Sequence, residues 1–304
     1  MSFGLLGAAP NFQKAIDIIL KPVLGKYASV YMDDVIISSP SFVHHVEHLR
    51  EVFRLLQEAG LTLNKYKCNF GCEKLKYLGL VISKDGITTD KSKVKAIIEM
   101  KPPKNAKEAA KFLGMTQWYQ EIIKGYADLC EPLYQLNKKY RKFIWLEETQ
   151  VAFESIQCAI MEAPVLKLPD FNVPFKLFTD ATSIGLGAVH TQDQRPITYS
   201  SRTLNNLKRN YTVTERECLV VIWALNFRTY FGLLSVKVIM DHAALTKLTN
   251  DKNLSSRMIR WALKLAKLNV GWEHRPGVQN VVTNVLSTYP VESIVSENIA
   301  CGSD

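Results

Sequence analysis

The sequence predicts a mixed α+β protein of two or three domains, in which two β-containing parts flank a helical stretch. Three observations support this prediction. Apolar runs of strand type alternate with segments of helical periodicity near both ends of the 304-residue chain. Between them, the lysine-rich segment 105–140 has the pattern of short helices, and the segment 163–174 holds three prolines, as is typical of an inter-domain linker. A chain of this length also exceeds one ordinary small domain.

Residues 27–39 predict a β-hairpin. The run YASVYMDDVIISS places β-rich apolar stretches on either side of two aspartates, Asp33 and Asp34, at the turn. Residues 42–60 then carry apolar side chains at helical spacing, and Gly60 suits the left-handed position that ends a helix.

The middle of the chain is predicted to be mainly helical. Gly125 and Pro132 are expected to break the lysine-rich stretch into short helices. The elements expected here are a β region at 75–83 with an Asp-Gly turn at 85–86, a helix at 89–101, the short helices of 105–140, and a helix at 145–163.

A different pattern begins after the linker. Its order is three strands, a helix, a strand, a helix, a strand and a short helix, which predicts a mixed α/β layer fold. The strands are expected at 175–180, 184–191, 196–200, 236–240 and 270–274, and the helices at 212–231, 255–268 and 280–286.

The composition favours a packed, basic protein. Apolar residues make up 47% of the chain and charged residues 22%, the net charge is +9, and the pI is about 9.1. A basic balance fits a polyanionic partner such as nucleic acid, although many soluble proteins of this size are mildly basic and bind none. The six cysteines show neither a disulfide framework nor zinc-ligand spacing, and we see no signal peptide or membrane span. We therefore expect an intracellular protein with reduced thiols.

The first candidate site is the adjacent pair Asp33 and Asp34. Neighbouring carboxylates repel each other unless a cation lies beside them, and Mg²⁺ prefers such oxygen ligands. A hairpin tip would hold the pair rigidly and expose it, as phosphoryl-transfer chemistry requires. The alternative is a solvated acidic turn, which is the usual meaning of an isolated Asp-Asp pair.

The second candidate site joins Asp180, Glu217 and Asp241. Two of these acids close strands and the third opens a helix, so three elements could bring them to one point. Three converging carboxylates could hold two Mg²⁺ ions roughly 4 Å apart. The structural alternatives are that Glu217 belongs to a capping box with Thr214 and that Asp180 caps the turn after its strand.

A third feature mixes basic and aromatic residues, and a fourth is a histidine trio. Cations among aromatics suit a nucleic-acid surface, but ordinary helix packing is the favoured interpretation of the pattern alone. The basic-aromatic residues are Trp118, Tyr119, Tyr126, Arg202, Lys208, Arg209, Arg257, Arg260 and Lys264. His44, His45 and His48 include a zinc-like i, i+4 pair, but no third ligand is evident, so we interpret them as a solvated helix face.

At these residues the chain resembles the pol polyprotein of gypsy-type LTR retrotransposons, from about Phe3 to about Ser287. Any one motif is weak, whereas the ordered set is highly specific. In chain order, the matching residues are Phe3-Gly4-Leu5 with Ala9-Pro10, Tyr31-Met32-Asp33-Asp34, Gly60-Leu61 with Lys67-Cys68, Tyr77-Leu78-Gly79, Phe112-Leu113-Gly114, Ala163-Pro164-Val165-Leu166, Thr179-Asp180-Ala181, Thr214-Glu215-Arg216-Glu217, Asp241-His242, and Arg275-Pro276-Gly277.

The resemblance implies a reverse transcriptase end followed by a ribonuclease H domain with a mixed five-stranded sheet. It implies RNA-directed DNA polymerase and ribonuclease H (endonuclease) activity, with primer–template nucleic acid and RNA–DNA hybrid as partners and no membrane. Asp33, Asp34, Asp180, Glu217 and Asp241 would be catalytic metal ligands for Mg²⁺, with Mn²⁺ as a substitute. The expected domains are palm 1–86, thumb 87–145, connecting helix and linker 146–174, ribonuclease H 175–290, and tail 291–304; the compartment would be a cytoplasmic particle or the nucleus.

The sequence departs from the family pattern in two ways. The palm strand that carries the family's first metal-binding aspartate would lie upstream of Phe3, so we expect no DNA synthesis by this chain alone. Asn284 stands where the family has aspartate, and an amide contributes a ligand oxygen but no charge. The alternative is therefore a catalytically inactive nucleic-acid-binding remnant of a decayed or domesticated element.

Overall fold

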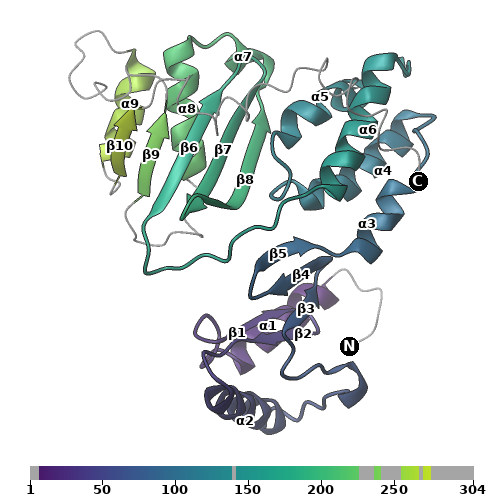
Figure 1. The fold of residues 1–304 in the computed structure, drawn as a ribbon, viewed down its shortest axis with the longest axis vertical. Helices are drawn as coiled ribbons and strands as arrows, with labels where there is room; N and C mark the ends of the chain where they lie inside the picture. The colour runs from purple at the N-terminus through teal and green to yellow at the C-terminus, as the bar shows by residue number, and fades with distance from the viewer. Residues whose placement is uncertain (1–6, 139–141, 226–235, 241–254, 267–269, 275–304) are drawn as a thin grey trace. The chain divides into compact units, whose positions relative to one another are not determined.

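The computed structural model describes residues 7–138, 142–225, 236–240, 255–266 and 270–274. The chain divides into two compact units between Glu73 and Lys74. Both are mixtures of helices and strands, which confirms the predicted fold class (Figure 1). None of the described helices is both long and apolar enough to cross a membrane.

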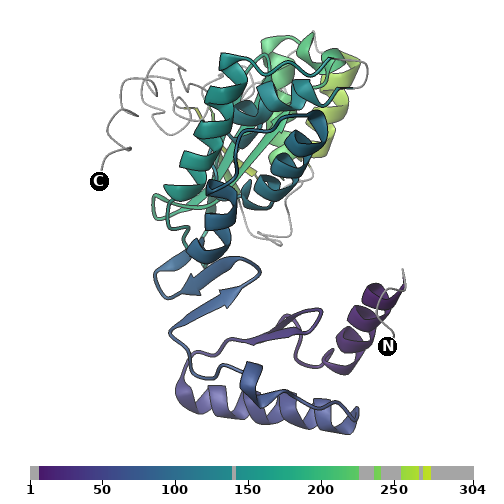
Figure 2. The ribbon, with the colours of Figure 1, turned by 90° about the vertical axis from the view of Figure 1, so that its right-hand side faces the viewer.

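The first unit is a hairpin packed between two helices (Figure 2). Its elements are α1 (Ala8–Ile19), β1 (Ala28–Tyr31), β2 (Asp34–Ile37), α2 (Phe42–Glu58) and a short 3₁₀ turn (Lys65–Lys67). A small core of Ile16 from α1, Leu20 just after it, Ala28 from β1, and Val52 and Leu56 from α2 joins them. The predicted hairpin and helix are thus confirmed. The helix begins at a Ser41 cap and is followed by Gly60, whose φ is 70°.

The second unit begins with an antiparallel three-stranded sheet: β3 (Lys74–Tyr77), β4 (Leu80–Ser83) and β5 (Gly86–Thr89). Its edge is extended by the proline-rich segment, because Ile87 and Leu166 exchange two backbone hydrogen bonds of 2.8 and 2.9 Å. The segment predicted to be a linker therefore pairs with a strand rather than running free.

Helices follow this small sheet and share one core. They are α3 (Lys91–Ile98), α4 (Ala106–Thr116), a 3₁₀ turn (Gln117–Tyr119), α5 (Tyr126–Leu136) and α6 (Glu147–Met161). The predicted break at Gly125 is confirmed, since φ there is 61° and α5 starts one residue later. The predicted break at Pro132 is wrong: α5 continues through it. Cys130 and Leu133 are fully buried on either side, so packing outweighs the local cost of the proline.

The larger sheet has five strands in the order β10-β9-β6-β7-β8 (Figure 1). Strands β6, β7 and β8 form an antiparallel meander, whereas β9 and β10 run parallel to β6. The strands are β6 (Phe175–Ala181), β7 (Gly185–Gln192), β8 (Arg195–Thr203), β9 (Val236–Met240) and β10 (Val270–His274), and the helices are α7 (Asn206–Arg209), α8 (Val213–Leu225) and α9 (Ser256–Ala266).

Helix α8 covers the middle of this sheet. It contacts β6 and β7, and α9 in turn packs against α8. Val220, Val221 and Ala224 of α8 are completely buried with Leu177 of β6 and Val238 of β9. The hydrophobic core under α8 thus fixes the position of its first turns, where the candidate Glu217 lies. The expected helix at 280–286 lies outside the described residues.

Candidate active site

Asp180 lies at the end of β6, at the centre of the five-stranded sheet. It pairs with Gly187 of β7, and its side chain is half-buried. The turn that follows is capped by Thr182, whose Oγ1 accepts hydrogen bonds from the backbone N–H groups of Ile184 (3.2 Å) and Gly185 (2.8 Å). The capping role that was the structural alternative for Asp180 is therefore filled by Thr182.

Glu217 lies in the second turn of α8 and is only 4% exposed. The capping box of Thr214 with Glu217, the structural alternative for this acid, is wrong, because the box is formed by Thr212 and Glu215. Glu215 N donates to Thr212 Oγ1 over 3.2 Å, and Thr212 N donates to Glu215 Oε2 over 3.1 Å. Because α8 packs on β6, in which Asp180 is the last residue but one, Glu217 is a buried carboxylate in the helix that covers this strand. Burying a charge is costly unless an opposite charge offsets it.

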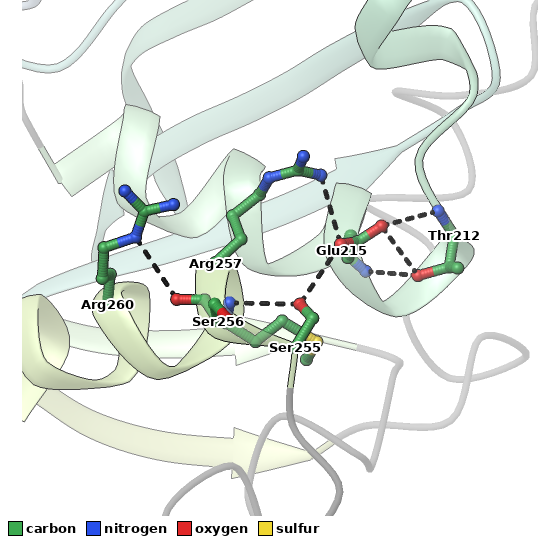
Figure 3. A network of polar contacts seen from close by, with 7 residues as sticks. Thr212, Glu215, Ser255, Ser256, Arg257 and Arg260 are labelled. Atoms are coloured by element: carbon green, nitrogen blue, oxygen red, sulfur yellow. Dashed lines mark hydrogen bonds and ion pairs between the residues drawn. The ribbon is translucent and has the colours of Figure 1, made fainter.

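A polar network fixes the start of α8 (Figure 3). Glu215 accepts hydrogen bonds from Ser255 Oγ (3.4 Å) and from the Arg257 guanidinium (3.2 Å), both at the start of α9. The same guanidinium lies 4.1 Å from the ring centroid of Tyr211, just before α8. The network therefore joins α8 to α9 within two residues of Glu217.

Asp128 of α5 is a neighbour of Asp180 that the sequence did not predict. Its carboxylate lies against Gly185 at the start of β7, where a Cβ built on the glycine would be 2.5 Å from Asp128 Oδ1. Desolvation by the surrounding protein, with added repulsion from Asp180 and then from Glu131, raises the pKa of Asp128 to about 6. Negative charge is thus concentrated at this end of the sheet, although Asp128 and Asp180 are 52 positions apart in the sequence.

The predicted site is only partly within the described structure. Asp241, which follows β9, and Asn284 lie outside the described residues. Within those residues no three His, Cys, Asp or Glu side chains are placed to hold a metal ion together. The donor set nevertheless has the chemistry of a hard-cation site, since Asp180 and Glu217 offer carboxylate oxygens from adjoining elements.

The other candidate acids, Asp33 and Asp34, lie where the sequence predicts them. Tyr31 pairs with Asp34 across the hairpin, so Met32 and Asp33 form the two-residue turn. Met32 has a φ of 52°, and its N–H donates to Gln13 Oε1 over 2.6 Å. Helix α1 therefore braces the turn through Gln13 and holds the two carboxylates at an exposed tip.

The structure places some residues of the predicted basic-aromatic surface in the core and others on the surface. Tyr119 and Tyr126 are 4% and 2% exposed and belong to the helical core, so the packing alternative is correct for them. Trp118 is exposed, and its indole N–H donates to the carbonyl of Leu78 over 2.8 Å. Arg209 forms an ion pair of 2.6 Å with Glu131.

The three histidines form contacts with serine side chains and are not simply a solvated helix face. Ser39 Oγ lies 3.2 Å from His45 Nδ1 and 2.8 Å from His48 Nδ1, and Ser41 Oγ lies 2.7 Å from His44 Nδ1. These contacts fasten the end of β2 to α2.

Comparison with known proteins gives two matches to family models. Residues 1–82 match the family described as reverse transcriptase (RNA-dependent DNA polymerase), and residues 170–268 match the RNase H-like domain found in reverse transcriptase. The chain is also 37% identical over 307 residues to the retrovirus-related Pol polyprotein from transposon opus of Drosophila melanogaster, and 36% identical over 313 residues to that from transposon gypsy. The chain is related to gypsy-type Pol polyproteins. The resemblance predicted from the motifs is thereby confirmed.

This Pol-related chain spans about a third of the length of its relatives. The alignments cover 95% and 98% of the chain but 31% and 30% of the opus and gypsy polyproteins. Among solved structures, the foamy viral protease-reverse transcriptase in complex with RNA/DNA hybrid matches 95% of this chain and 41% of that chain, with a TM-score of 0.76 and 24% identity. A second foamy viral structure, in complex with double-stranded DNA, matches with a TM-score of 0.77 at 23% identity and covers 94% of this chain and 50% of that chain. Both likenesses concern the fold.

Proposed function

We propose that this chain is a metal-dependent nuclease that cleaves the RNA strand of RNA–DNA hybrids. Asp180, Glu217 and Asp241 would hold Mg²⁺, or Mn²⁺ in its place. The hairpin that carries Asp33 and Asp34 would belong to an RNA-directed DNA polymerase site on primer–template nucleic acid. The neighbours bound to RNA/DNA hybrid and to double-stranded DNA support this choice of partner.

One observation carries the nuclease proposal. Glu217 is buried in α8, which packs on the strand that carries Asp180, and the two capping roles that were the alternatives for these acids are filled by other residues. Thr212 and Glu215 cap the helix, and Thr182 caps the turn. A buried carboxylate is costly for stability, and a bound cation is one way to offset that cost.

The chemistry that Mg²⁺ supplies when bound is activation of a water molecule and stabilisation of the leaving oxygen of a phosphodiester. The chain's own contribution is to place the ligand oxygens. Asp180 is held by the pairing of β6 with β7, and Glu217 by the core under α8 and by the network around Glu215. Elements this rigid suit a site that must hold its ligands in fixed positions.

Hydrolysis of a labelled RNA strand in an RNA–DNA hybrid tests the proposal. We expect Mg²⁺-dependent cleavage that Asp180→Asn and Glu217→Gln each reduce at least about 100-fold, because each removes a charged ligand. Asp193→Asn is a matched control, since Asp193 lies just beyond the far end of β7 and the charge change is the same. The nuclease proposal fails if the Asp180 and Asp193 variants cleave equally well.

Asn284 favours a second candidate, an inactive module that binds nucleic acid without cutting it. This position lacks the charge of the aspartate seen in the family pattern. If the first proposal holds, Asn284→Asp should increase the cleavage rate and lower the Mg²⁺ concentration needed for half-maximal rate. Binding of the hybrid without cleavage in both proteins would instead establish the inactive module.

The polymerase assignment has a separate test. Fe²⁺ bound in place of Mg²⁺ reduces added hydrogen peroxide to hydroxyl radicals, with ascorbate regenerating Fe²⁺ from Fe³⁺. The radicals cut the nearby backbone, so mass spectrometry can locate a metal site. We expect cuts near residues 31–35 that disappear in Asp33→Asn/Asp34→Asn. Their persistence in that double variant would contradict the assignment.

A further inference from the structure

A groove of about 710 Å³ lies between α5 and the connection from β8 through α7. This volume is typical of a binding site for an organic ligand. Its walls combine aromatic, aliphatic and cationic side chains, including Tyr126, Tyr134, Lys138, Arg202, Leu207 and Arg209.

The walls of the groove are held together by direct contacts. The backbone N–H of Ala127 in α5 donates to Ser201 Oγ in β8 over 2.9 Å, and Thr203 Oγ1 donates to the carbonyl of Ala127 over 3.4 Å. Glu131, one turn further along α5, forms the 2.6 Å ion pair with Arg209. The groove is therefore formed before any ligand enters.

The groove carries uncompensated positive charge. The charges of Arg209 and Glu131 cancel each other in their ion pair. Lys138 and Arg202 are both exposed, and no described carboxylate lies within 4 Å of either cation. The lining thus has a net charge of about +2 and complements an anion with more than one charge.

The uncharged part of the lining suits flat organic groups. The Tyr126 hydroxyl lies 2.8 Å from Thr116 Oγ1 inside the helical core, so its polar end is already engaged there. Tyr134 is partly buried, and Leu207 is 78% exposed at the edge of the groove, so its side chain is open to a ligand. Aromatic rings beside separated cations are the features that hold a nucleic-acid strand by its bases and phosphates.

We propose that this groove binds a single nucleic-acid strand, with phosphates at Arg202 and Lys138 and a base or sugar against Tyr134 and Leu207. The identity of the strand rests on the proposed function. Ala127 and Glu131 line the groove, and Asp128 between them lies against Gly185 near Asp180. Helix α5 therefore borders both the groove and the end of the sheet that carries Asp180. A strand bound at Asp180 can continue into the groove.

Fluorescence anisotropy with a labelled ten-nucleotide single strand tests this inference. Arg202→Gln/Lys138→Gln is expected to weaken binding about 25-fold at 0.1 M salt and to lower the slope of log Kd against log [salt] by about 1.4, as the loss of two phosphate contacts predicts. Lys91→Gln/Lys93→Gln is the matched control, because it removes two exposed lysines of α3. Equal weakening by both double variants would overturn the inference, since only net charge would then matter.

A second substitution probes the groove without removing a cation. Leu207→Gln should weaken strand binding because it removes the apolar contact, and Leu207→Glu should weaken it several-fold more, because the carboxylate also repels phosphates. Displacement of the strand by poly-glutamate at equal charge concentration would overturn the proposal in favour of an acidic protein partner. Because Leu207 is exposed, both variants are expected to keep the wild-type circular dichroism spectrum.

Hybrid cleavage measured on the same proteins separates this inference from the proposed function. Strand binding that depends on the groove in a chain without nuclease activity would support the groove and contradict the nuclease. Cleavage that depends on Asp180, together with strand binding that is insensitive to Arg202 and Lys138, would overturn the groove alone.

Discussion

His190 makes the stability of the five-stranded sheet sensitive to acid, and His190→Leu removes this sensitivity. The side chain is completely buried in β7, where it pairs with Leu177 of β6 and Thr198 of β8. Burial lowers the pKa of His190 from 6.5 to about 3, because a charged imidazole would lose its contact with water. Leucine has a similar volume and does not take up a proton.

The size of the effect follows from the two pKa values. Below pH 6.5 the unfolded chain binds a proton at His190 that the folded chain does not accept until about pH 3, so the free energy of unfolding decreases as the pH falls through this interval. Between pH 7 and pH 5 this one group lowers the free energy of unfolding by about 1.9 kcal/mol. The value at pH 5 changes little as long as the folded pKa stays below about 4.

Urea unfolding followed by tryptophan fluorescence measures this difference. All five tryptophans lie in the second unit, so the signal does not report on the first; they are Trp118, Trp145, Trp223, Trp261 and Trp272. The wild-type protein should lose about 1.9 kcal/mol more than His190→Leu on going from pH 7 to pH 5. Between pH 7 and pH 8 the two proteins should change in parallel. Equal losses at pH 5 would show that His190 is protonated in the folded state.

Two further predictions concern contacts that fix the second unit. Gly86→Ala should lower the free energy of unfolding by about 3 kcal/mol or more, because φ is 135° and a Cβ would lie 2.0 Å from the carbonyl oxygen of Leu166. The control is Gly114→Ala in α4, where a Cβ would meet open space; it should be neutral or stabilise the protein by up to about 1 kcal/mol. Equal effects of the two substitutions would refute the steric argument. Arg257→Ala should lower the free energy of unfolding, measured by thermal melting, by about 1–2 kcal/mol. It leaves Glu215, whose side chain is only 14% exposed, without its ion-pair partner Arg257. Adding Glu215→Gln should recover part of that loss, and a double variant that is less stable than Arg257→Ala would contradict this explanation.

Local patterns in the sequence were enough to predict the strands of the larger sheet, the hairpin turn and the end of α2, but not α1 or β5. The hairpin at Asp33 and Asp34 needs only β-rich runs around a tight turn, and the end of α2 needs only Gly60. Pro132 was misjudged because its cost is local, whereas the burial of Cys130 and Leu133 that offsets it depends on helices and strands elsewhere in the chain. For Tyr119 and Tyr126 the sequence favoured helix packing but left a nucleic-acid surface open, since a helical pattern does not show what covers each face.

The capping box of α8 shows a second limit of prediction from the sequence. The spacing of a hydroxyl followed three residues later by glutamate occurs twice in a row, at Thr212 with Glu215 and at Thr214 with Glu217. Local sequence does not distinguish the two frames, because both satisfy the rule. The docking of α9 does, since Ser255 and Arg257 approach Glu215. The choice of frame thus decides which glutamate caps the helix and which is left buried beside β6.

Asp128 was not predicted from the sequence, although it lies beside Asp180, because its position also depends on how helices and strands pack together. Asp128 is one acid among several on a lysine-rich helical stretch, and nothing in its neighbours distinguishes it. Its position follows from the docking of α5 on β8, through Ala127 with Ser201 and Glu131 with Arg209. That docking brings the Asp128 carboxylate near Asp180 and forms one wall of the groove. If α5 were displaced, both features would be lost together, so a substitution that weakens the docking, such as Ser201→Ala, should alter strand binding and also lower the pKa of Asp128 towards its ordinary value.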